Sequence, residues 1–269
     1  KLFKLSEPDF VGNSFPSFPT ISQQPTKQPV HFQFEQWELF MGYLAQKTEG
    51  KARKEMTFDE YKNLEFNKFY RINQRNLVDL FDALWVTYFW FLRSQDLQKL
   101  RIEWFREDPK NREFVLRIED PKSDRRVIET RNIKDGAYDF FKRLLKRRPS
   151  SGWLIMPLVK RESEGGAENK VSRDLNKIYK VICGECLPDF PKSEVKITNV
   201  RHTTFRHHLE DDMTFGQYPK IVDFATNGCT SPEMLQKTYI NYISRETSLR
   251  ESKNKMRPSN FSLIKRVGI

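Results

Sequence analysis

Apolar residues recur along this 269-residue chain mostly at the spacing of amphipathic helices. A helical pattern begins near Glu35, and residues 76–92 form a strongly apolar stretch that we expect to be a buried helix capped by Asn76. The next helix is expected over residues 94–100, with Ser94 as its cap. The same spacing predicts later helices over residues 135–148, 171–182, 199–211, 218–226 and 231–243.

The middle of the chain changes to a pattern typical of strands. Residues 101–105, 114–118 and 126–130 alternate or run apolar, and turn residues separate the last two. These segments predict a small antiparallel sheet with Lys122 at a hairpin tip. The expected fold class is therefore mainly α with a small antiparallel β-sheet (α+β).

The two ends of the chain differ from its centre. Residues 1 to about 30 contain five prolines among serine and glutamine, which is typical of an extended arm without its own core. The last residues are basic and end in an apolar patch. We expect an arm over residues 1–33, a folded domain over 34–245 and a basic C-terminal tail over 246–269.

Composition narrows the class of partner. The formal net charge of +11 favours a polyanion. A membrane surface is the competing interpretation, but the longest apolar run, Ala83 to Leu92, is too short to cross a bilayer. Three cysteines, an odd number, favour a reducing compartment over a disulfide scaffold. We expect a cytoplasmic location.

Three segments carry residues suited to phosphoryl transfer. One begins Thr198-Asn-Val-Arg201, another ends in Lys-Thr-Tyr239, and the third is Arg93-Ser-Gln-Asp96. Moving a phosphodiester onto a side chain needs a nucleophile, neutralisation of charge on the phosphate oxygens and a proton donor for the leaving oxygen. A tyrosine and two arginines supply the first two requirements without a metal.

In this order and spacing, the segments resemble the catalytic domain of tyrosine recombinases, the phage-integrase type of DNA strand-exchange enzyme, over roughly residues 34–245. The resemblance implies a DNA breaking-rejoining fold, double-stranded DNA as partner, no cofactor and no metal. It implies a tetramer on DNA and a monomer when free. The arm would link to a missing upstream DNA-binding domain, and the tail would be exchanged between protomers. The implied setting is integration or excision of a phage or other mobile element, at the bacterial nucleoid or host-cell DNA.

The resemblance also implies residue roles. Arg93 and Arg201 would clamp the scissile phosphate, and Tyr239 would attack it to form a 3′-phosphotyrosine. Lys122 would protonate the leaving 5′ oxygen. Structural roles stay open for each of them: a helix-end arginine, a basic helix face, a packing tyrosine and a solvated turn lysine. His202 is expected to be structural, and Tyr242 lies outside the motif register.

Two positions depart from the family pattern. Thr198 and Cys229 stand where the family usually has histidine. Both side chains can donate a hydrogen bond, but neither exchanges protons near neutral pH as histidine does. We therefore expect reduced or tightly regulated activity, with these two residues in supporting sites. Two alternatives remain: a DNA-binding protein of this fold without cleavage activity, and a type IB topoisomerase-like DNA-relaxing enzyme.

Two further patterns concern phosphate binding and metal binding. A basic cluster near the end of the helix expected over 135–148 suits phosphate contacts, through Lys142, Arg143, Lys146 and Arg147. The run Cys183-Gly-Glu-Cys186, followed by His202 and His207, approaches zinc-finger spacing. Prolines follow the second cysteine and the hydrophobic residues of a finger are out of place, so we expect no metal there.

Overall fold

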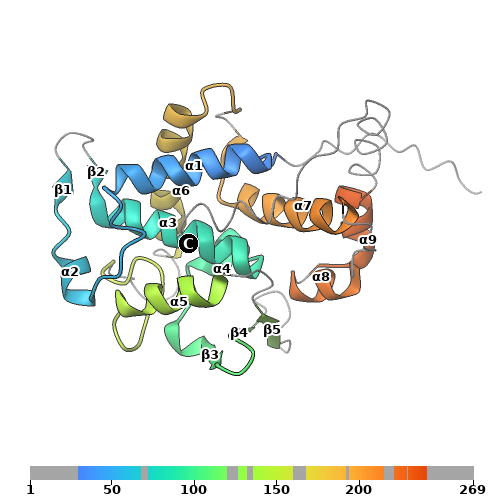
Figure 1. The fold of residues 1–269 in the computed structure, drawn as a ribbon, viewed down its shortest axis with the longest axis horizontal. Coiled ribbons are helices and arrows are strands. Elements are labelled where there is room, and N and C mark those ends of the chain that lie inside the picture. Colours follow the sequence, from blue (N-terminus) through green and yellow to red (C-terminus); the bar gives the residue numbers. More distant parts are fainter. Residues whose placement is uncertain are drawn as a thin grey trace, which may run out of the picture.

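The computed structural model describes residues 30–67, 72–119, 127–131, 136–159, 168–191, 194–214, 221–228 and 230–240. Within these ranges the chain is mostly helical (Figure 1). The α-helices are α1 (Phe34–Lys47), α2 (Phe58–Lys62), α3 (Gln74–Trp90), α4 (Ser94–Leu97), α5 (Ala137–Lys146), α6 (Glu168–Cys186), α7 (Thr198–Thr214), α8 (Ile221–Asn227) and α9 (Pro232–Leu235). A 3-10 turn, η2 (Ile102–Trp104), and a π-helical turn, η4 (Gln236–Ile240), complete the helical elements described.

The strands form two small antiparallel sheets. β3 (Phe105–Asp108), β4 (Glu113–Glu119) and β5 (Val127–Arg131) pair in that order. β4 and β5 lie where the alternation predicted strands, but the strand expected over residues 101–105 is wrong, because residues 102–104 form η2 and β3 begins at Phe105. A second sheet, β1 (Phe66–Asn67) with β2 (Ile72–Asn73), was not predicted because each strand is two residues long. The expected fold class, mainly α with a small antiparallel sheet, is confirmed.

Helix α3 runs through the centre of the molecule and contacts α1, α6 and α7 (Figure 1). Nearly all of its side chains are buried, the two acidic ones, Asp79 and Asp82, among them. Its aromatic residues pack against those of α1, with the Trp37 and Tyr88 rings stacked at 5.1 Å. In the part of the chain that the structure describes, no helix combines the length and apolar character needed to span a membrane.

The start of α3 and the start of α4 each differ from the sequence expectation. The cap of α3 is Asn73, whose side chain accepts a hydrogen bond from the backbone N–H of Arg75, rather than Asn76. The residue before α4 is Arg93, and Ser94 is its first helical residue. Both errors shift a boundary by a few residues, which is the usual precision of a pattern.

The folded region begins earlier than expected. Phe32 is fully buried and stacks on Phe190, with ring centroids 4.5 Å apart. Its backbone N–H donates to the hydroxyl of Thr203 in α7 at 2.9 Å. Phe32 therefore belongs to the core, although it lies within the range expected for the arm. The part of that arm before residue 30, and the tail over 246–269, lie outside the described residues.

Candidate active site

A second apolar cluster lies apart from the main core. It is formed by α7, α8, α9 and η4 together with the residue that follows α3. In Figure 1, α7, α8 and α9 stand together at one end of the molecule. The cluster consists of Phe91, Phe205, Leu209, Phe224, Ala225, Leu235 and Tyr239. It is this packing that brings two of the three motif segments side by side.

The start of α7 is fixed from two directions. The backbone N–H of Ile197 donates to the side chain of Asn176 in α6 at 2.9 Å. The side-chain amide of Asn199 donates to the carbonyl of Val30 at 2.7 Å. These contacts hold the first turn of α7, and with it Arg201, against the body of the domain.

Arg201 is buried, with 9% of its surface exposed. Its guanidinium donates to the carbonyl oxygens of Phe91 and Gly228 and lies 5.2 Å from the centre of the Phe205 ring. One carbonyl belongs to the α3–α4 junction and the other to the loop between α8 and α9. These two acceptors are neutral backbone carbonyls from different segments, and together they fix the position of the guanidinium.

The two carbonyls that hold Arg201 belong to residues with special steric surroundings. Phe91 adopts the left-handed conformation, with φ 53° and ψ 32°, and this ends α3. At Gly228 a Cβ atom would lie 2.2 Å from Cζ of Phe205, so glycine is needed for this close approach. The site therefore depends on one strained helix end and one glycine.

Tyr239 lies in η4, which contacts α7. It is 8% exposed, packs on the Phe205 ring at 5.5 Å between centroids, and its hydroxyl is hydrogen-bonded to Nδ1 of His202. Burial raises the pKa of Tyr239 above its ordinary value, and the positive charge of Arg201 opposes that rise. The phenol is thus protonated at rest.

His202 is close to both residues. The pKa of His202 is lowered to about 4. Burial is the largest cause, and electrostatic repulsion from Arg201 and His31 adds to it. Its ring is therefore neutral at pH 7, and one ring nitrogen of a neutral imidazole accepts a hydrogen bond. We expected His202 to be structural, but its ring contacts the hydroxyl of the candidate nucleophile. The sequence feature that could have indicated a role for His202 in the site is its position directly after Arg201.

Arg93 precedes α4, near the start of α7. The hydroxyls of Ser94 and Thr198 lie 3.2 Å apart, which joins the starts of the two helices. Arg93 is half-buried, and its backbone N–H donates to Asp96 at 2.9 Å. Since Arg93 stands two residues after Phe91, whose carbonyl holds Arg201, the structure brings the two arginine-bearing segments together.

Two site candidates lie outside the described residues, namely Lys122 and Cys229. Their flanking segments are described. β5, the strand that follows Lys122 in the chain, contacts α8, and Gly228, which precedes Cys229, contacts Arg201. The roles expected for these two residues stay predictions.

The candidate DNA contacts on α5 divide into two groups. Lys142 and Lys146 are exposed and form ion pairs with Glu107 at 2.9 Å and Glu55 at 2.7 Å, and Arg143 is half-buried. Arg147 is wrong as a DNA contact, because it is 1% exposed and its guanidinium pairs with a buried carboxylate.

That carboxylate belongs to Asp82 of α3, which also accepts from Arg148 at 2.6 Å. Arg148 reaches a second buried acid, Asp79, at 3.0 Å. Burial raises the pKa of Asp79 to about 6, although Arg148 acts in the opposite direction. The two arginines that follow α5 and the two aspartates of α3 therefore form a buried ionic network that links the two helices.

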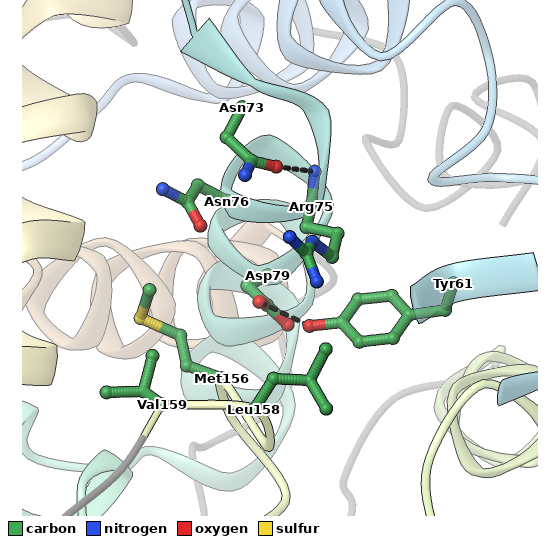
Figure 2. Close-up of a pocket in the computed structure, with 8 residues that line it drawn as sticks. All are labelled: Tyr61, Asn73, Arg75, Asn76, Asp79, Met156, Leu158 and Val159. Carbon is green, nitrogen blue, oxygen red and sulfur yellow. Dashed lines mark hydrogen bonds between the residues drawn. The ribbon is translucent and has the colours of Figure 1, made fainter. Parts of the chain in front are cut away.

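A pocket of about 160 Å³ opens beside this network (Figure 2). Figure 2 shows the Tyr61 hydroxyl donating to Asp79, and the Asn73 side chain bonded to the backbone of Arg75. In both cases the polar side chain forms a hydrogen bond within the protein. The pocket is lined by Tyr61, Asn73, Arg75, Asn76, Asp79, Met156, Leu158 and Val159, none of which is a predicted site residue.

The zinc-finger spacing leads to no metal centre in the part of the chain that is described, where no group of three or more histidine, cysteine or acidic residues gathers. Cys183 is fully buried in the main core. The ring nitrogens of His207 lie 3.1 Å from the Tyr88 hydroxyl and 3.1 Å from the Phe32 carbonyl. Both residues thus have structural roles.

Comparisons with known proteins assign this chain to no family. No protein-family model matches it, and no curated protein matches it. A solved structure that it resembles is that of the Tn1549 transposon integrase (residues 82–397) in complex with circular intermediate DNA, at 18% sequence identity. The match covers 74% of this chain and 67% of that chain, with a TM-score of 0.40. A likeness of this size assigns no role to any residue of the site.

Proposed function

We propose that this chain is a site-specific DNA recombinase that cleaves and rejoins strands through a 3′-phosphotyrosine intermediate. The observation that carries the proposal is that Tyr239 and Arg201 both pack on the ring of Phe205, and that the Arg201 guanidinium is held by carbonyls from two other segments. A tyrosine beside an arginine fixed in this way is suited to attack a bound phosphodiester. The order of the motif segments in the sequence supports the same activity.

In the proposed reaction, the phenolic oxygen of Tyr239 forms a bond to phosphorus while the bond from phosphorus to the 5′ oxygen breaks. Arg201 and Arg93 stabilise the charge that develops on the non-bridging oxygens. Lys122 donates the proton that the 5′ oxygen needs, and Thr198 and Cys229 contribute hydrogen bonds. The phosphotyrosine keeps the free energy of the broken bond, so rejoining by a 5′ hydroxyl requires no cofactor.

The proposed partner is double-stranded DNA, consistent with the net charge of +11. The chain would act as a tetramer on DNA and be a monomer when free, in the cytoplasm or at host-cell DNA. Its setting would be the integration or excision of a phage or other mobile element. Lys142, Arg143 and Lys146 stay in the proposal as phosphate contacts, and Arg147 does not.

One observation favours a second candidate, a DNA-binding protein of this fold that does not cleave. Tyr239 is 8% exposed and its pKa is raised, so the phenol is poorly suited to attack in the state described. A type IB topoisomerase-like enzyme would share the same tyrosine chemistry. Relaxation of a supercoiled plasmid without pairing of two DNA sites would favour that enzyme over a recombinase.

Covalent trapping tests the proposal without knowledge of the target sequence. The full chain is incubated with a pool of nicked duplexes of randomised sequence, in which cleavage releases a short fragment and blocks rejoining. We expect a denaturation-resistant protein–DNA adduct that Tyr239→Phe abolishes. Tyr242→Phe is the matched control and should retain the adduct. Absence of adduct with the wild-type chain, or its persistence in Tyr239→Phe, would contradict the proposal.

A further inference from the structure

We infer that His202 is the general base that removes the phenolic proton when Tyr239 attacks phosphorus. The inference rests on the proposed function and names a catalytic residue that the sequence motifs do not supply. The carrying observation is direct contact, because Nδ1 of the His202 ring is hydrogen-bonded to the Tyr239 hydroxyl. That hydroxyl is the group that must lose a proton for the reaction to begin.

The contact is held by packing from both sides. His202 lies in the first turns of α7, and Tyr239 lies in η4, which contacts α7. The Tyr239 ring is fixed against Phe205, four residues along α7 from Arg201. The proton donor and its acceptor are therefore placed by the same helix that places the phosphate-binding arginine.

The charges around His202 set its resting state. The groups that act on it are Arg201 beside it on α7 and His31 from the segment before α1, and the neutral Tyr239 faces it from η4. Together with burial, the positive charge of Arg201 keeps the imidazole unprotonated at pH 7, so one ring nitrogen can take a proton. A phosphodiester bound at Arg201 adds a negative charge, which favours protonated imidazole. Binding of DNA thus prepares His202 to accept the proton from Tyr239.

The proton balance of the step closes within the site. The phenolic proton moves from Tyr239 to Nδ1 of His202, and the electron pair left on the phenolic oxygen forms the bond to phosphorus. The electron pair of the breaking bond stays on the 5′ oxygen, which takes its proton from the ammonium group of Lys122. In rejoining, the protonated imidazole returns the proton to the departing phenolate. Thr198 and Cys229, which exchange protons poorly near neutral pH, are not required for this transfer.

The test compares variants on a nicked duplex recovered from the trapped pool. His202→Asn places an amide where Nδ1 stands, so it preserves a hydrogen bond to Tyr239 but cannot take a proton. We expect adduct formation at pH 7 to slow by about 10²–10⁴-fold in this variant, with DNA binding and thermal unfolding nearly unchanged. His202→Gln is a second variant, in case the first folds poorly. Cleavage within a few-fold of the wild type in either folded variant would overturn the inference.

A pH profile separates proton removal from positioning. In the wild type, the cleavage rate should level off once the imidazole in the complex is unprotonated. In His202→Asn it should keep rising about tenfold per pH unit, because the phenol must then ionise into solvent. Parallel profiles for the two proteins would mean that His202 merely positions the tyrosine.

A substrate with sulfur in place of the bridging 5′ oxygen distinguishes the two proton transfers. Sulfur leaves as a thiolate without protonation, so this substrate should restore cleavage to Lys122→Ala but not to His202→Asn. Restoration of both variants would overturn the assignment of His202.

If the wild-type chain forms no adduct on any member of the pool, the proposed function fails and the role of His202 fails with it. If Tyr239→Phe abolishes the adduct while His202→Asn does not slow it, the proposed function stands and the role of His202 alone fails.

Discussion

The Tyr239 hydroxyl and Nδ1 of His202 are hydrogen-bonded to one another, although 37 residues separate them in the chain. The bond joins the candidate nucleophile to a neutral base within reach of the charge of Arg201. Substitutions at Arg201, Gly228 and Asp82, and a pH series on His202, test how this arrangement and the core beneath it are stabilised.

Arg201→Lys should slow adduct formation by about 10²–10³-fold, the range measured when one donor to a developing charge is removed. A lysine ammonium has no planar fork, so it cannot hold the Phe91 and Gly228 carbonyls and a phosphate in the same geometry. Single-turnover cleavage on a nicked duplex measures the effect. Activity equal to the wild type would show that charge alone is sufficient at this position.

Gly228→Ala should destabilise the domain by about 1–3 kcal/mol, because the added Cβ would lie 2.2 Å from the ring of Phe205. Gly42→Ala is the matched control, since a Cβ there meets nothing within 4 Å and alanine favours helix. Urea denaturation compares the two. Adding Phe205→Leu to Gly228→Ala should recover part of the loss, and a loss unchanged by that second substitution would contradict the steric explanation.

Asp82→Asn should destabilise the protein by about 3–5 kcal/mol, because two buried guanidinium groups lose their shared carboxylate. Asp139→Asn, which breaks the exposed pair with Arg112, should have little effect. Thermal and urea unfolding measure both variants. Similar stability in the two would mean that the network is hydrated rather than dry.

The protonation of His202 should make stability depend on pH. Its pKa is about 4 in the folded protein and near 6.5 when exposed, so the unfolded state binds the proton first as pH falls. The stability that the neutral ring contributes is present above pH 6.5 and is lost by up to about 3 kcal/mol as pH falls towards 4. His202→Asn should remove this dependence.

Asp79 works in the opposite sense over part of the same range. Its pKa is raised, so the folded state binds a proton more readily than the unfolded state and stability increases as pH falls below about 6. The contribution of His202 is therefore read from the difference between wild-type and His202→Asn unfolding free energies at each pH. A difference that stays constant from pH 7 to pH 4 would contradict the low pKa of His202.

The sequence predicted the elements well where apolar periodicity was long. The buried helix α3 and the hairpin strands β4 and β5 were found within a few residues. It could not show which charges are buried. Arg147 belongs to a run of basic residues, and its burial depends on Asp82, 65 residues away, whose carboxylate compensates the charge.

The site was predicted as a list of residues, but their contacts were not. The motifs named Arg201 and Tyr239, while the link through His202 required α7 and η4 to pack together. The burial of Phe32 was missed for a similar reason. Its neighbours in the sequence are rich in proline, and its burial depends on contact with a residue far along the chain, Phe190. Long-range packing of this kind leaves no periodic trace in the chain.

The carbonyl contacts of Arg201 also bear on how the protein acquires activity. They span 110 residues on one side and 27 on the other, so neither half of the chain carries a complete anion-binding centre. Contacts of such long sequence separation form late in folding. On the proposed function, a newly made chain would therefore be inactive until the segment that includes Gly228 has been synthesised and has packed against Arg201.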